Sequence, residues 1–73
     1  MPALRRPQPL ALYDRGDLVR ALACADVAIR DLELVVGQLE RGLVRPAEAV
    51  GVAENVDRAV DRVRFIAAAW AAQ

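Results

Sequence analysis

Few side chains in this sequence could carry out covalent or acid–base chemistry. The 73 residues include no His, Lys, Ser or Thr, so the commonest general base and the hydroxyl and amine nucleophiles are absent. Cys24 is the single thiol, and no imidazole is present to convert it into a reactive thiolate. We therefore interpret Cys24 as a buried structural residue and expect no catalytic residue in the chain.

Carboxylate pairs at helical spacing could in principle bind a metal ion. Asp57 and Asp61 form one such pair, and Glu33 and Glu40 form another. The di-iron helical bundles combine carboxylates of this kind with Glu-x-x-His motifs, which require the His that this chain lacks. One Cys without any His also excludes a zinc site. We expect neither a metal site nor a cofactor.

A cluster of arginines in the C-terminal half has two interpretations. Arg58, Arg62 and Arg64 could together bind an anionic ligand. The alternating signs of Glu54, Arg58, Asp61 and Arg64 favour a simpler arrangement, a solvated helix face with weak ion pairs of about 0.2–0.5 kcal/mol each.

Charge and hydropathy narrow the class of protein. Ten basic and ten acidic residues give zero net charge, which disfavours binding to nucleic acid or to an anionic membrane surface. No run of 18 apolar residues could form a membrane span, and the N-terminus lacks the apolar core of a signal peptide, so a cytoplasmic location is expected. Because every basic residue is Arg and because Ala and Val are abundant, a high-GC source such as an actinobacterium or its phage is expected.

Two helices should position these residues. Residues 1–13 include three prolines and two arginines, which predict a flexible tail before a helical domain at residues 14–73. Asp17 is expected to cap a first helix at about residues 17–41. Gly42 suits the left-handed position after a helix and Pro46 the first position of the next, so residues 42–45 should form a turn. The second helix is expected at about residues 46–72.

A heptad pattern of apolar residues predicts how the helices pair. The spacing of four and three residues continues without a break through both helices, which is typical of a packed seam. Two such helices joined by a short turn predict an all-α fold, an antiparallel two-helix hairpin. Trp70 should then lie at the open end of the hairpin, level with Leu18. The principal members of this predicted seam are Leu18, Leu22, Ile29, Leu32, Val36, Val52, Val56, Val63, Ile66 and Trp70.

More apolar side chains are present than one seam can bury. Val27, Leu34, Val60 and Phe65 fall away from the predicted seam. A helix that is apolar around so much of its circumference is usually covered by more than one neighbour. We therefore expect these four residues to be buried between chains or against a partner protein. The simplest arrangement is a homodimer of hairpins that forms a four-helix bundle.

The function that these patterns favour is that of a non-enzymatic helical adaptor or regulatory protein. Such a protein would act by self-association and by binding the helices of other proteins. A nucleic-acid-associated regulator is the first alternative, because Ala47 and Gly51 have the spacing of a helix-turn-helix motif, although Asp57 falls where that motif needs an apolar residue. A small all-helical mutase is the second alternative, and the absence of Lys disfavours it.

Overall fold

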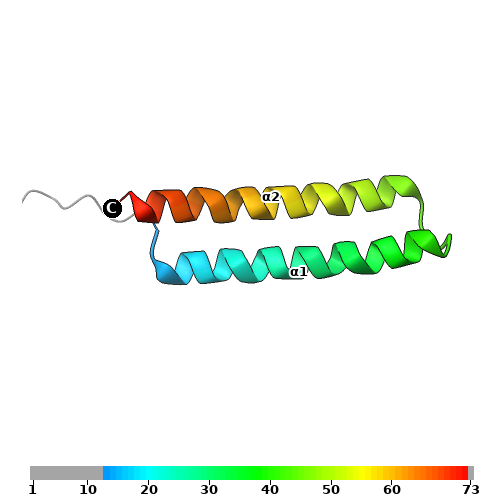
Figure 1. The fold of residues 1–73 in the computed structure, drawn as a ribbon, viewed down its shortest axis with the longest axis horizontal. Coiled ribbons are helices and arrows are strands. Elements are labelled where there is room, and N and C mark those ends of the chain that lie inside the picture. The colour runs from blue at the N-terminus through cyan, green and yellow to red at the C-terminus, as the bar shows by residue number, and fades with distance from the viewer. Residues whose placement is uncertain (1–12, 73) are drawn as a thin grey trace, which may run out of the picture.

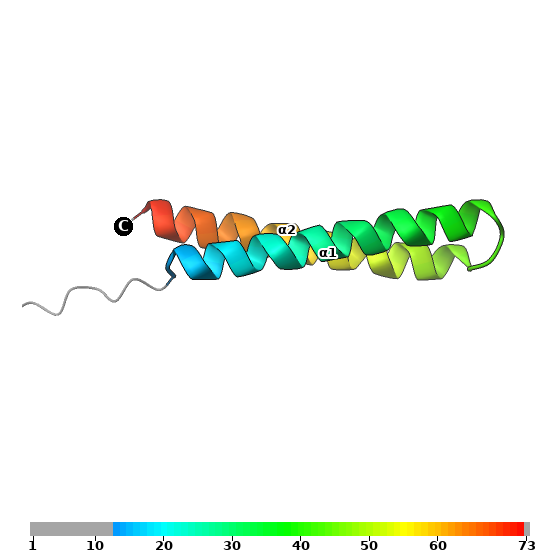
Figure 2. The ribbon, with the colours of Figure 1, turned by 90° about the horizontal axis from the view of Figure 1, so that it is seen from below.

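The computed structural model describes residues 13–72 and contains two long helices. Helix α1 spans Arg15–Glu40 and helix α2 spans Pro46–Ala71, each with 26 residues. They run antiparallel and side by side, so that the start of α1 and the end of α2 meet at one end (Figure 1). Seen from below, the two helices cross one another along their length (Figure 2). The predicted two-helix hairpin is thus confirmed, while the expected tail lies outside the described residues except for Tyr13.

Helix α1 begins earlier than the sequence suggested, because two aspartates cap each other. The backbone N–H of Asp17 donates to the side chain of Asp14 over 2.9 Å, and the N–H of Asp14 donates to the side chain of Asp17 over 3.0 Å. This reciprocal arrangement is a capping box, which satisfies two N–H groups that a helix end leaves free. The prediction that Asp17 is the N-cap is therefore wrong: Asp14 is the cap, and Asp17 lies in the first turn.

The turn between the helices is made by residues that the sequence singled out. Gly42 adopts a left-handed conformation with φ of 72°, as predicted. The N–H of Gly42 donates to the carbonyl of Leu39 over 3.0 Å, and that of Leu43 to the carbonyl of Gln38 over 2.8 Å. These two bonds define a Schellman motif, which ends α1 by satisfying its last carbonyls. Pro46 then occupies the first position of α2, where a missing N–H costs nothing.

The face of α1 that packs against α2 consists mainly of small residues. Ala21, Ala25 and Val35 are buried there. Half-buried residues continue the same face at Leu18, Ala28, Leu32 and Leu39. Small side chains let two helices approach closely, since interaxial distance follows the side chains at the contact.

Three large residues of the predicted seam lie beside this face. Leu22, Ile29 and Val36 are 51%, 41% and 40% exposed. Helix α1 contains two possible seven-residue repeats of apolar residues, and both include Leu18, Ala25, Leu32 and Leu39. One repeat is completed by Ala21, Ala28 and Val35, and the other by Leu22, Ile29 and Val36. The structure turns the repeat with the smaller side chains toward α2 and leaves the larger side chains of the other repeat at the edge of the contact.

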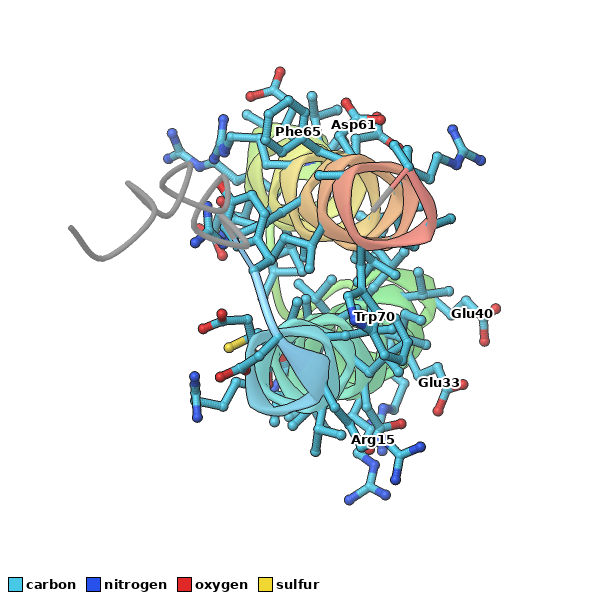
Figure 3. All side chains as sticks on the ribbon, turned by 90° about the vertical axis from the view of Figure 1, so that its left-hand side faces the viewer. Arg15, Glu33, Glu40, Asp61, Phe65 and Trp70 are labelled. Carbon is cyan, nitrogen blue, oxygen red and sulfur yellow. The ribbon has the colours of Figure 1, made fainter. Side chains whose placement is uncertain are left out.

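Helix α2 turns the expected residues toward α1. Ile66 is the most deeply buried side chain in the described part of the chain, at 1% exposure. Trp70, at the open end, points from α2 toward α1 and remains partly exposed (Figure 3). The half-buried residues of this face are Ala49, Val52, Val56, Ala59 and Val63.

Candidate helix-binding surface

The outside of the hairpin carries many large apolar side chains. In a two-helix hairpin each helix has only one neighbour, so most of its circumference faces water. The exposed large apolar residues are Val19, Leu22, Val27, Ile29, Leu34, Val36, Leu43, Val50, Phe65 and Trp70. Isolated apolar residues on a surface are ordinary, whereas rows of them mark contact surfaces. The arrangement of these residues into rows therefore decides what the surface can bind.

Leu22, Ile29 and Val36 form one such row, which we name the flank stripe. They follow each other at intervals of seven residues, so they lie along one line of α1 over roughly 21 Å. On α2 the half-buried Val60 lies on the same side of the hairpin, at about the level of Ile29. The flank stripe is thus continuous with the core on its inner side and open to water on its outer side.

The opposite side of the hairpin is polar. Cys24, Asp31 and Gln38 follow the other edge of the inward face of α1. Glu48, Asn55 and Arg62 follow the matching edge of α2. The hairpin therefore has one apolar flank and one polar flank, and of these two only the first offers apolar burial to a helical partner.

Cys24 lies on the polar flank and is exposed. The prediction that this thiol is buried is therefore wrong. The reason is the orientation of α1: its inward face is centred on alanines, and Cys24 falls beyond their edge. A free thiol in this position contributes little to the packing between the helices.

The four residues expected at an interface do not share one surface. Val27 and Leu34 lie seven residues apart on the outward side of α1, and both are more than half exposed. Phe65 lies on α2, where its ring meets the ring of Tyr13 edge-on, with 5.9 Å between centroids and 83° between planes. Val60 is half-buried on the apolar flank. The structure thus groups Val27 with Leu34, and it separates both from Phe65 and Val60.

Charged residues outside the apolar rows pair mainly within their own helix. The ion pairs in residues 13–72 are Arg20–Asp17 at 2.6 Å, Arg30–Asp26 at 3.0 Å and Arg64–Asp61 at 3.8 Å, all with exposed or half-exposed side chains. Arg58 donates to the side-chain oxygen of Asn55. Exposed pairs of this kind contribute at most about 1 kcal/mol each. They fit the solvated helix face that the sequence favoured over an anion site.

One carboxylate has a shifted titration. The backbone N–H of Asp14 donates to the carboxylate of Asp17, and the Arg20 guanidinium lies against it, so the pKa of Asp17 falls below its ordinary value. This shift belongs to the helix cap and stabilises the start of α1. It does not indicate a catalytic group, because both partners are structural.

Two charged residues that border the flank stripe have no ion pair within the described residues. Arg15 lies in the same row as the stripe, seven residues before Leu22, and Glu40 lies in the next row at the other end of α1. Within the described residues, neither Arg15 nor Glu40 takes part in an ion pair. Figure 3 shows Arg15, Glu33 and Glu40 projecting from α1 on the side where Trp70 lies.

Other kinds of site are not found in residues 13–72. No three side chains of the types that bind metals come together there. Neither α1 nor α2 is long and apolar enough to cross a membrane. No protein-family model, curated protein or solved structure matches the chain. The geometry of the exposed apolar rows therefore carries the functional argument alone.

Proposed function

We propose that this chain is a non-enzymatic helical adaptor that self-associates and binds a helix of another protein. The observation that supports the proposal is the presence of two separate apolar rows on the outside of the hairpin. These are the flank stripe and the outward pair Val27 and Leu34. An adaptor needs two surfaces, because it must hold one partner while it contacts another.

The energetic argument concerns the cost of leaving these rows in water. Burying a side chain the size of Val or Leu contributes roughly 1.5–3 kcal/mol. A few such residues are comparable with the entire stability of a small domain, about 5–15 kcal/mol. A chain of 73 residues buries a smaller fraction of its surface than a larger domain does, so association is the most direct source of further stability.

Self-association would produce a four-helix bundle from two hairpins. In a bundle of this kind each of the four helices buries an apolar stripe in the shared core. Two-fold dimers are also the commonest oligomers. The outward pair Val27 and Leu34 would remain available after dimerisation. At seven-residue spacing these two side chains suit the apolar face of an amphipathic partner helix.

Measuring the mass and the melting temperature together tests this proposal. We expect light scattering at micromolar concentration to give the mass of two chains. We also expect the melting temperature, followed by circular dichroism, to rise with protein concentration, because association stabilises only the folded state. A wild-type chain that is monomeric, fully helical and stable, with a melting temperature independent of concentration, would overturn the proposal.

A further inference from the structure

We propose that the flank stripe is covered by the flank stripe of a second copy of this chain, in antiparallel orientation. In this dimer α1 packs on α1 of the second copy, α2 packs on α2, and a two-fold axis passes near Ile29. The inference rests on the proposed self-association and specifies the face and the orientation that it uses.

The first argument is the way α1 divides its apolar residues. Toward α2 it presents Ala21 and Ala28, while the larger Leu22 and Ile29 remain 51% and 41% exposed beside them. A helix with a single neighbour gains most when its largest apolar residues face that neighbour. A helix shared between two neighbours can give small residues to the closer one and large residues to the other. The exposed flank stripe fits the second case.

The second argument is the symmetry of the flank stripe. Ile29 lies midway between Leu22 and Val36, at seven residues or about 10 Å from each. When a copy is reversed end to end, Ile29 meets Ile29 of that copy, and Leu22 meets its Val36. Large residues therefore face large residues along the whole stripe. On α2, Val60 would meet its own counterpart near the same axis.

Charge complementarity supplies the third argument. Reversal about Ile29 brings Arg15 within about 4.5 Å, along the helix axis, of Glu40 of the second copy. The symmetry produces this pairing twice, and both residues lack ion pairs within the described part of their own chain.

The size of the face agrees with a stable dimer. Two helices of 26 residues are each about 39 Å long, and at a separation of 8–10 Å they present a face roughly 18–20 Å wide. The resulting area is about 700–800 Å² for each copy. Specific interfaces typically bury about 800 Å² per partner, so the apolar flank is large enough.

Cross-linking at the symmetry axis tests the face. The variant Ile29→Cys is made in a Cys24→Ala background, oxidised, and analysed on a non-reducing gel. We expect most of the chain to become a disulfide-linked dimer, because the two-fold axis brings the two introduced thiols together. The matched control is Leu34→Cys in the same background, which is also exposed but lies on the outward side of α1. We expect the control to remain at the mass of one chain.

Charge reversal tests the orientation. Arg15→Glu and Glu40→Arg should each weaken dimerisation by roughly three- to tenfold, since two exposed ion pairs are lost in each case. The double variant should restore the affinity of the wild type. Both single changes place a charge at the helix end that favours it, so helicity should be retained or increased. A loss of affinity is therefore distinguishable from a loss of folding.

The possible outcomes separate this inference from the proposed function. The antiparallel dimer is supported if the cysteine at position 29 cross-links, the cysteine at position 34 does not, and the double charge variant recovers the dimer affinity of the wild type. A dimeric wild type that cross-links through Leu34 instead, or equally at both positions, overturns the inference while self-association stands. A dimer that cross-links through Ile29 without restoration by charge exchange overturns the antiparallel orientation. A monomeric wild type overturns both proposals.

Discussion

Asp14 and Asp17 show how two residues can define the start of a helix. Each side chain accepts the backbone N–H of the other, which leaves the first turn of α1 with fewer free donors. The carboxylate of Asp17 also contacts Arg20 at 2.6 Å. Because these donors interact with the ionised carboxylate, the pKa of Asp17 is lower in the folded chain than its ordinary value of 3.8.

This pKa shift predicts how stability changes in acid. A group whose folded pKa is lowered stabilises the protein at pH above its ordinary value, and this contribution is lost as the pH falls through the lowered pKa. We expect Asp17→Asn to remove that contribution, so that its melting temperature falls less than that of the wild type as the pH decreases below about 4. Circular dichroism melts at a series of pH values measure the difference.

Asp31→Asn is the matched control for the acid experiment. Asp31 is exposed on the same helix and takes part in no ion pair within residues 13–72. Its variant should follow the wild type across the acid range. If Asp17→Asn also followed the wild type, the capping box would make no pH-dependent contribution.

At the scale of elements, a glycine in the turn and a glycine inside α2 have opposite effects on stability. Gly42 has φ of 72°, a conformation in which a side chain is strained, whereas Gly51 lies in the interior of α2. A methyl group added at Gly51 would have no neighbouring atom within 4 Å. One glycine is therefore required by the backbone, and the other weakens its helix.

Substituting each glycine by alanine should change stability in opposite directions. Gly42→Ala should cost about 1–2 kcal/mol, the penalty for a side chain in the left-handed region. Gly51→Ala should stabilise α2 by about 0.5–1 kcal/mol, because alanine loses less entropy in a helix. Thermal melts at one fixed protein concentration compare the two variants with the wild type. Equal effects of both substitutions would contradict the assignment of Gly42 to the Schellman motif.

The elements were largely predictable from local signals, whereas the orientation of α1 was not. Gly42 and Pro46 mark the turn because their backbone preferences are specific to those positions. The start of α1 was misplaced because Asp14 and Asp17 are both good caps, and only their mutual bonding selects Asp14. The inward face depends on which helix surface α2 meets, and hydrophobic periodicity alone cannot distinguish two repeats that share four of their seven members. For the same reason the sequence pattern grouped Val27, Leu34, Val60 and Phe65 into one interface, whereas the structure separates Val27 and Leu34 from the other two.

At the scale of the whole molecule, a pair of aromatic rings connects the residue before the α1 cap with the last two turns of α2. Tyr13 precedes α1 and Phe65 lies near the end of α2, and their edge-on contact connects the helices at the open end of the hairpin. The covalent turn connects them at the other end (Figure 1). The hairpin is thus held at both extremities by different means.

A double-mutant cycle measures what the aromatic pair contributes. Tyr13→Ala and Phe65→Ala, made singly and together, should show a coupling energy of about 0.5–1.5 kcal/mol, the range for ring pairs of this geometry. The cycle isolates the ring contact from any other interaction of either residue. As a control, Tyr13→Ala combined with Val50→Ala should be additive, because Val50 lies near the turn. Additivity of the Tyr13 and Phe65 changes would mean that the contact contributes nothing to stability.

The position of the turn also sets the order in which the hairpin folds. Contacts next to the turn join residues about ten apart in sequence, whereas Tyr13 and Phe65 are about fifty apart. Closing the longer loop first would cost roughly 1.4 kcal/mol more in chain entropy, so the helices should zip together from Gly42 outward. The ring contact would be the last to form and the first to open. Amide protons should therefore exchange with solvent fastest near Arg15 and Ala71, and progressively more slowly toward the middle of each helix.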